Sequence, residues 1–208
     1  LVWGLAKSPR GDHVEGNLAL QKRHGCGIVG PKRESAKIPG IDREVSGGDS
    51  FQWAGREVTV FDCPGHTLGH IAYHIPNEQA VFAGDTLFSL GCGRVFEGTL
   101  EDMYRSVTQF GSLPPETRLY CGHEYTQSNA RFALAVEPGN IALRQRATEV
   151  DRLRAQGRMT CPSSIGAELA TNPFLRTASP EIRRNLGMEN STDAEIFAEL
   201  RRRKDRFK

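Results

Sequence analysis

The 208-residue chain is poor in cysteine and has no pair of cysteines spaced as C-x-x-C. Five cysteines in this arrangement argue against a disulfide framework and against a zinc site built from thiolates. The sequence also lacks an apolar run of the roughly 20 residues that cross a membrane, and its start does not resemble a signal peptide. We therefore expect a cytoplasmic protein with no membrane partner.

An excess of one charge is absent as well, because 27 basic residues face 25 acidic ones and the net charge is only +2. The basic residues gather in one place, residues 201–208, where six of eight are Lys or Arg. A nucleic-acid-binding surface would need more basic residues and interleaved aromatics, so we expect no nucleic-acid partner. The basic end is then either a solvated helix end or a site for an anionic small molecule.

Hydrophobic periodicity divides the chain near residue 123. Before it, short strands alternate with a few helices; after it, apolar residues recur at helical spacing, as in Leu143, Ala147, Val150 and Leu153. We expect an α/β domain over 1–123 and a small all-helical domain over 124–208. The elements expected in the first domain are helices at 11–24 and after the capping-box residue Thr99, and strands at 28–30, 50–53, 57–61, 71–75, 80–83 and 119–121.

Three segments place a metal-binding side chain beside glycine, just after a short apolar run. They contain His66 (Gly-His-Thr), Asp85 (Gly-Asp-Thr) and His123 (Cys-Gly-His). A strand that ends at glycine directs the next side chain off the edge of the sheet. Convergence of three such edges is a common way to assemble a metal cage, so the pattern predicts a metallohydrolase.

The order of these segments, together with Gly91-Cys-Gly-Arg-Val-Phe96 and Asn172-Pro-Phe-Leu-Arg176, resembles glyoxalase II. These are the hydroxyacylglutathione hydrolases of the metallo-β-lactamase superfamily. The resemblance implies an αββα sandwich followed by a small helical domain. It also implies a monomer that hydrolyses S-2-hydroxyacylglutathione, such as S-lactoylglutathione, to glutathione and a 2-hydroxy acid.

The resemblance further implies two metal ions, with zinc expected and iron or manganese as alternatives. In the family pattern one ion is held by His66 and by two histidines of an H-x-H-x-D-H motif. The other is held by Asp12, His13 and His123, and Asp85 bridges both. We take Asp12 and Asp85 as the catalytic carboxylates of the site.

The first metal site departs from this pattern, because Ser8 and Arg10 occupy the positions of its two histidines. Serine is a poor neutral ligand, and arginine stays protonated and cannot bind a cation. We therefore expect the site of Asp12, His13 and His123 to be complete and the site of His66 to be doubtful, with impaired activity as the result.

The segment before Asp12 is the second departure. In the family several strands precede this motif, and eleven residues are too few for them. We expect residues 1–11 to reflect a truncated or frame-altered start in which the first strands of the sandwich are missing. The alternative is a genuine single-metal variant in which Arg10 replaces the charge of the missing ion.

The substrate side of the family pattern is better preserved. The positions that match its glutathione-binding residues are Arg94, Phe96, Tyr125, Arg201 and Lys204. Basic residues suit a ligand with two carboxylates, because a guanidinium binds a carboxylate through two hydrogen bonds. This match favours the anion-binding interpretation of the basic end over a solvated helix.

Two other functions stay open from the sequence. One is a catalytically weak or dead remnant that binds glutathione or a metal. The other is a different enzyme of the superfamily, such as a lactonase or a persulfide dioxygenase. The substrate-binding positions and the long helical segment favour the thioester hydrolase. His70 is expected to support the site rather than to bind metal.

Overall fold

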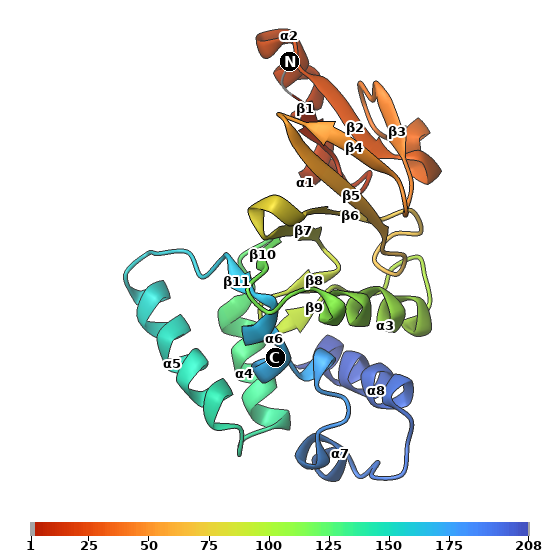
Figure 1. Cartoon of the computed structure of the whole chain (residues 1–208). Coiled ribbons are helices and arrows are strands. Elements are labelled where there is room, and N and C mark those ends of the chain that lie inside the picture. Colours follow the sequence, from red (N-terminus) through yellow and green to blue (C-terminus); the bar gives the residue numbers. More distant parts are fainter. Residues whose placement is uncertain (1–2, 208) are drawn as a thin grey trace.

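Two β-sheets face each other in the first part of the chain (Figure 1). The computed structural model describes residues 3–207. The smaller sheet is parallel, in the order β1 (Trp3–Leu5), β2 (Gly27–Pro31) and β3 (Arg43–Val45). The larger sheet has the order β11-β10-β7-β6-β5-β4, with bounds β4 (Ser50–Trp53), β5 (Arg56–Asp62), β6 (Ile71–Ile75), β7 (Ala80–Gly84), β10 (Arg118–Cys121) and β11 (Ser163–Ser164).

The sheets pack through the alternating apolar residues of their strands. Val29 and Val45 of the smaller sheet share one buried cluster with Val58, Tyr73 and other residues of the larger sheet. Because side chains alternate across a strand, β5 buries Val58 and Val60 on the same face. The Tyr73 hydroxyl donates to the carbonyl of Ala6 over 2.7 Å and ties the two sheets together.

Helices cover the outer faces of both sheets, which gives the expected αββα order. Val14 of α1 (Gly11–Val14) and Ile38, after the 3₁₀ helix η1 (Lys32–Lys37), pack on the smaller sheet. On the larger sheet lies α3 (Leu100–Thr108), which begins with the predicted capping box of Thr99 and Asp102. Further short elements are α2 (Asn17–His24), η2 (Pro76–Glu78), β8 (Leu87–Phe88), β9 (Gly91–Cys92) and η3 (Gln109–Ser112).

The beginning of the chain differs from the expectation in three ways. The helix predicted over 11–24 is split into α1 and α2, because Gly16 interrupts it, and Leu18 is exposed instead of buried. Strand β1 lies upstream of Asp12, in a segment where no strand was predicted. Strand β3 was not predicted either, because only three residues form it.

The second part of the chain is mainly helical and wraps around one end of the larger sheet (Figure 1). It also adds the short strand β11, which pairs with β10. Within residues 3–207, no helix is long and apolar enough to cross a membrane. The helices are α4 (Thr126–Val136), α5 (Ile141–Ala155), α6 (Ile165–Thr171), η4 (Pro173–Leu175), α7 (Pro180–Leu186) and α8 (Asp193–Arg206).

Candidate metal centre and substrate cavity

Glycines at two strand ends bring the expected metal ligands together. Gly84, the last residue of β7, has a φ of 55°, a left-handed conformation that turns Asp85 out of the sheet. Gly122 follows the neighbouring strand β10, and a Cβ atom there would collide with the carboxylate of Asp85. Glycine at this position therefore lets Asp85 and His123 approach one another.

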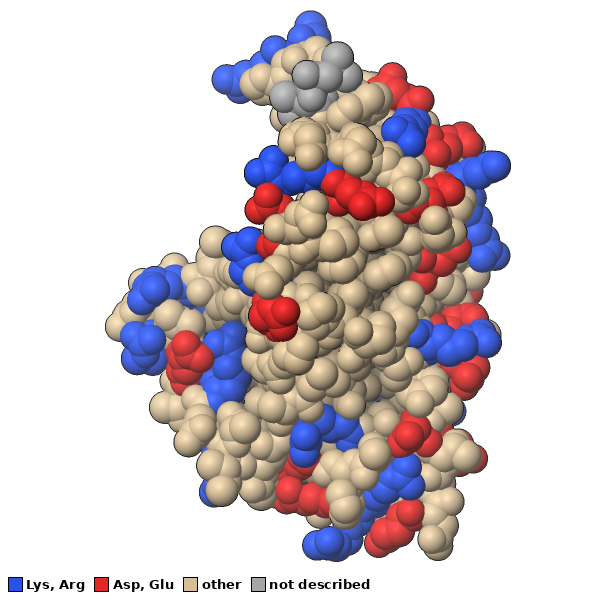
Figure 2. All heavy atoms as spheres, viewed as in Figure 1, with Lys and Arg blue, Asp and Glu red and all other residues tan. Residues whose placement is uncertain are grey.

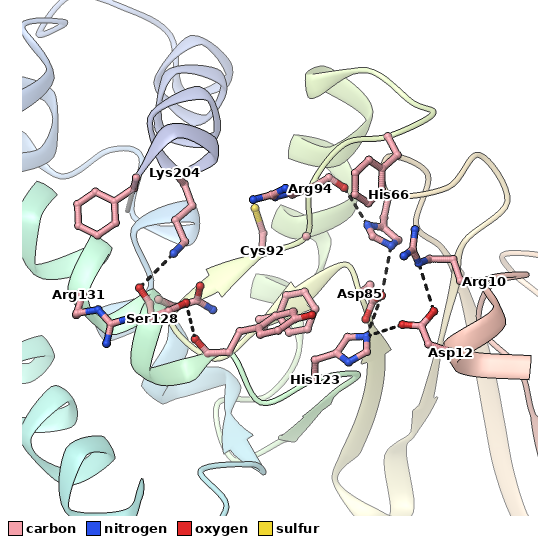
Figure 3. A pocket seen from close by; sticks show the side chains of 16 residues that line it. Arg10, Asp12, His66, Asp85, Cys92, Arg94, His123, Ser128, Arg131 and Lys204 are labelled. Atoms are coloured by element: carbon pink, nitrogen blue, oxygen red, sulfur yellow. Dashed lines mark hydrogen bonds and ion pairs between the residues drawn. The ribbon is translucent and has the colours of Figure 1, made fainter.

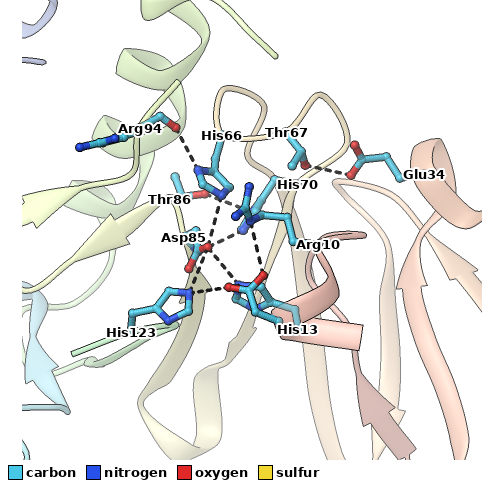
Figure 4. A network of polar contacts seen from close by, with 11 residues as sticks. Arg10, His13, Glu34, His66, Thr67, His70, Asp85, Thr86, Arg94 and His123 are labelled. Carbon is cyan, nitrogen blue, oxygen red and sulfur yellow. Dashed lines mark hydrogen bonds and ion pairs between the residues drawn. The ribbon is translucent and has the colours of Figure 1, made fainter. Parts of the chain in front are cut away.

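Four side chains from three segments form a compact cluster (Figure 4). One ligand atom from each of Asp12, His13, Asp85 and His123 lies within 4.8 Å of all the others. Oδ2 of Asp85 is central: His13 Nε2 lies 3.0 Å from it and His123 Nε2 lies 3.5 Å from it. His123 Nε2 is also 3.2 Å from Asp12 Oδ2.

Asp85 is 3% exposed, and it remains a carboxylate in spite of this burial. Burial by itself raises its pKa, because desolvation disfavours the charged form. The hydrogen bond with the imidazole of His13 is the largest of the effects that outweigh burial and hold the pKa of Asp85 well below its ordinary value. The cluster therefore has a negative charge at its centre, which suits a cation.

His66 presents one ring nitrogen to the cluster. Its Nδ1 lies 2.9 Å from the carbonyl of Arg94, and a carbonyl only accepts, so Nδ1 is the donor. Nε2 then points at Asp85 Oδ2, 3.3 Å away. Neither Nε2 of His66 nor Oδ1 of Asp85 has a hydrogen-bond partner among residues 3–207, although both atoms are buried. Buried acceptors in this state are what a metal ion satisfies.

His70 holds the ligand Asp85 in place, as the sequence predicted. Its Nε2 accepts from the backbone N–H of Asp85 over 3.1 Å, so its Nδ1 carries the proton and donates to Thr86 Oγ1. Burial lowers the pKa of His70 to about 3, and the ring is therefore neutral. His70 acts on the site through Asp85.

Arg10 lies at the position expected for the other metal ion. Its Nε is 3.5 Å from Asp12 Oδ1, and its guanidinium carbon is 5.3 Å from the centre of the Phe96 ring. In Figure 4 this side chain extends across the cluster toward His66. Ser8 is fully buried nearby in sequence, and its hydroxyl has no partner within residues 3–207.

The donor set therefore fits one metal ion. Two imidazole nitrogens and two carboxylates converge in the cluster of Asp12, His13, Asp85 and His123, and zinc, iron and manganese accept such ligands. A second ion would have only His66 and the shared Asp85, with the guanidinium of Arg10 beside it. Two ligands next to a fixed positive charge do not make a metal site.

A cavity of about 450 Å³ opens from this cluster (Figure 3). Three basic residues also belong to its lining: Arg131 and Lys204 lie at the end away from the metal cluster, and the guanidinium of Arg94 lies between them and His66. Two aromatic side chains beside the metal cluster are largely solvent-exposed: Phe96 is 57% exposed, with its ring 5.1 Å from that of His66, and Tyr125 is 52% exposed, with its ring 5.2 Å from that of His123. Exposed aromatics beside a charged cavity are typical of a ligand-binding site.

Lys204 is perturbed by its surroundings. Burial of the ammonium group, followed by the charges of Arg201 and Arg131, lowers its pKa to about 8. Its Nζ donates to the carbonyl of Ser128 over 3.1 Å and faces the rings of Phe132 and Phe207. An anionic ligand would stabilise the charged form of Lys204 against this loss of its proton.

One expected substrate residue is placed elsewhere. Arg201 is only 3% exposed and does not line the cavity. Its guanidinium donates to the carbonyl of Cys92 over 2.7 Å and pairs with Asp205 at 2.9 Å. It therefore supports the wall of the cavity from beneath, and the prediction that it contacts substrate is wrong. Arg131, which the sequence analysis missed, provides the additional cation; no motif marks it, because it lies within α4.

Comparison with known proteins agrees with this arrangement. Residues 11–123 match the family model of the metallo-β-lactamase superfamily, and residues 124–207 match that of the hydroxyacylglutathione hydrolase C-terminus. The chain belongs to the hydroxyacylglutathione hydrolase family. It is 53% identical over 203 residues to the hydroxyacylglutathione hydrolase of Rhizobium meliloti (strain 1021), covering 98% of this chain and 79% of that protein.

Other members of the hydroxyacylglutathione hydrolase family have a similar sequence identity to this chain. The chain is 56% identical to the enzyme of Brucella anthropi over 196 residues, which are 94% of this chain and 75% of that protein. Because the Rhizobium alignment covers 98% of the chain, it reaches upstream of Asp12.

Solved structures support the fold alone. ETHE1 from Myxococcus xanthus superposes with a TM-score of 0.62 at 23% identity, covering 98% of this chain and 76% of that chain. The BLEG-1 B3 metallo-β-lactamase superposes with a TM-score of 0.60 at 19% identity, covering 84% and 77%.

Proposed function

We propose that this chain hydrolyses the thioester bond of S-2-hydroxyacylglutathione, with S-lactoylglutathione as a representative substrate. One observation carries the proposal: a single cavity has metal-binding side chains at one end and basic side chains at the other. Hydrolysis of a glutathione thioester needs both ends, one for the reacting carbonyl and one for the tripeptide. The relatives that match most of the chain bear the name of this activity.

The basic end suits glutathione, which carries two carboxylates. Arg94 and Arg131 can each form two hydrogen bonds to a carboxylate, and Lys204 adds a point charge. Tyr125 and Phe96 line the cavity beside the metal cluster, where they offer apolar contact to the acyl and cysteinyl groups. The substrate is thereby oriented with its thioester toward Asp12 and Asp85.

At the metal end of the cavity, the residues can hold the metal ion and accept a proton from the attacking water. Asp12, His13, Asp85 and His123 would hold one divalent ion, which supplies Lewis-acid polarisation and makes water a stronger acid. The half-exposed carboxylate of Asp12 lies at the mouth of the cluster and can accept a proton from the attacking water. His70 keeps Asp85 oriented throughout.

The chemistry balances without a further reactant. The oxygen of water bonds to the thioester carbon and the carbon–sulfur bond breaks. One proton of the water goes to the glutathione thiolate, and the other is released to solvent. The 2-hydroxy acid leaves as a carboxylate. We infer zinc as the ion, with iron and manganese as alternatives. A cytoplasmic location and a monomeric state stay predictions.

A second candidate is a glutathione-binding protein with little turnover, and the position of Arg10 favours it. The match of residues 124–207 to the hydroxyacylglutathione hydrolase C-terminus supports the hydrolase over a lactonase or a persulfide dioxygenase. One experiment separates these functions. Metal-free protein is reconstituted with zinc, iron or manganese, and the disappearance of the thioester of S-lactoylglutathione is followed.

We expect metal-dependent hydrolysis that Asp85→Asn abolishes, at a rate below that of the hydroxyacylglutathione hydrolase of Rhizobium meliloti assayed in parallel. Asp49→Asn is the matched control and leaves the rate unchanged, because Asp49 is exposed, lies in the turn between β3 and β4 and does not line the cavity. Binding of glutathione without metal-dependent hydrolysis would establish the second candidate instead.

A further inference from the structure

We propose that Arg10 takes the place of the second metal ion: the chain binds one ion, and the guanidinium of Arg10 binds the acyl oxygen of the substrate. The inference deepens the proposed function and rests on it for the identity of the substrate. It assigns a binding role to a residue that occupies a histidine position of the family pattern. The position, the charge and the hydrogen-bonding capacity of Arg10 support this role.

The first property is position. Arg10 lines the same cavity as Asp12, His66 and Asp85, at the metal end and not at the glutathione end. Its side chain is held on two sides, by Asp12 Oδ1 at 3.5 Å from Nε and by the ring of Phe96 at 5.3 Å from the guanidinium carbon. In Figure 3 it points into the space between His66 and Asp12. A carbonyl that approaches the cluster therefore meets this group.

The second property is charge. A guanidinium stays protonated under all conditions at which the protein is folded, so it is a permanent cation beside the carboxylate of Asp12. A divalent ion at the same place would face this charge with only His66 and Asp85 to hold it. Arg10 therefore excludes the second ion and also replaces part of its positive field.

The third property is hydrogen-bonding capacity. A guanidinium has five N–H donors, and the contact with Asp12 uses the Nε side of Arg10. Its side chain is 41% exposed, so the terminal amino groups remain accessible from the cavity. Such donors can bind the carbonyl oxygen and stabilise the negative charge that develops on it during hydrolysis. Phe96 limits where the guanidinium can move, which keeps these donors directed at the cavity.

The metal content of the protein tests the first half of the proposal without any activity assay. Metal-free protein is reconstituted with excess zinc, freed of unbound ion and analysed for zinc per chain. We expect one equivalent for the natural chain and two for the double variant Ser8→His, Arg10→His, which restores the ligands of the second site. Circular dichroism checks that the variant is folded.

Two equivalents in the natural chain would overturn the proposal. A folded double variant that still binds one equivalent would overturn it as well, because residues 8 and 10 would then not decide the stoichiometry. Failure of the thioester assay described above leaves both of these outcomes unaffected. The two proposals can therefore fail separately.

Ligand binding tests the second half. Glutathione and S-carboxymethylglutathione, whose added carboxylate stands for the acyl oxygen, are titrated calorimetrically into zinc-loaded protein. We expect Arg10→Ala, still holding one equivalent of zinc, to lose about tenfold in affinity for S-carboxymethylglutathione and nothing for glutathione. Exposed Arg23→Ala on α2 is the matched control and changes neither affinity.

An equal loss for both ligands, or no loss for either, would contradict a contact between Arg10 and the acyl oxygen. If neither the natural chain nor any variant binds glutathione, the proposed function is wrong. The role of Arg10 in metal stoichiometry is then still decided by the zinc content.

Discussion

Single residues set the spacing of the metal centre. At Gly84 and Gly122 the lack of a side chain brings Asp85 and His123 together, and His70 then fixes Asp85 through its backbone N–H. At the opposite end of the cavity, Lys204 shows how burial tunes a binding group, since its pKa falls to about 8. Both ends thus depend on side chains that are partly withdrawn from water.

Lys204 gives the cavity a pH dependence. Below pH 8 the ammonium group is charged and binds a carboxylate; above pH 8 it loses its proton, and binding weakens. We therefore expect the KM for S-lactoylglutathione to rise between pH 7 and about pH 9.5, after subtraction of spontaneous hydrolysis. Lys204→Met should raise KM about tenfold at pH 7 and remove most of this rise, with kcat little changed.

Exposed Lys22→Met on α2 is the control and should retain the profile of the natural chain. A KM in Lys204→Met that keeps the full pH dependence would show that another group titrates in the binding site.

At the scale of elements, the β8–β9 hairpin carries Cys92 and Gly93 to the cavity and is held by two buried polar side chains. Leu90, in its turn, has a φ of 60°, which is unfavourable for a residue with a branched side chain. Glu168 of α6 accepts from the backbone N–H of Leu90 over 2.7 Å. Asn172 donates to the carbonyls of Phe88 and Gly91, at 3.1 and 3.0 Å.

Asn172→Ala should therefore destabilise the protein strongly. The substitution removes the side-chain donor from the carbonyls of Phe88 and Gly91 and the acceptor of the Phe174 N–H. We expect a loss of about 2–4 kcal/mol in the free energy of unfolding, or roughly 5–10 °C in Tm. Calorimetry measures it, with the exposed Asn77→Ala as a control that stays within about 0.5 kcal/mol.

At the scale of the whole molecule, both parts of the chain share one hydrophobic core. Val81, Val107 and Leu119 of the first part lie in the same buried cluster as Phe174 and Phe197 of the second. Charges of both signs intermingle over the face shown in Figure 2, without a basic tract. A shared core predicts that the two parts unfold together.

Phe197→Ala tests this cooperativity. The ring lies 5.5 Å from that of Tyr104 and 5.4 Å from that of Phe174, so its loss leaves a cavity between the parts. We expect a cost of about 3–5 kcal/mol. Both tryptophans, Trp3 and Trp53, lie in the sandwich, so their fluorescence reports the first part while far-UV circular dichroism reports mainly the helices.

In denaturant, Phe197→Ala should lower the midpoints of the fluorescence transition and of the circular dichroism transition by the same amount. A circular dichroism transition that moves while the fluorescence transition stays in place would mean that the parts unfold independently.

Local patterns predicted much of this molecule. The strands at 50–53 and 71–75 and the capping box of Thr99 are found as expected, since alternation and capping act between near neighbours. The split of the helix at 11–24 was missed, because its apolar residues do not all face one surface. Strands β1 and β3 were missed because three residues carry too little periodicity.

Sequence reasoning was enough to predict the family and four side chains that cluster as a metal site, and it placed Ser8 and Arg10 where the resemblance implies histidines. These follow from residue identity and spacing, which do not depend on how distant segments pack. Only the tertiary structure decided that Arg201 is buried under the cavity wall, that Arg131 faces the cavity and that Arg10 extends over the cluster. The direction in which a long side chain points is fixed by contacts between segments far apart in the chain, and the sequence pattern does not contain them.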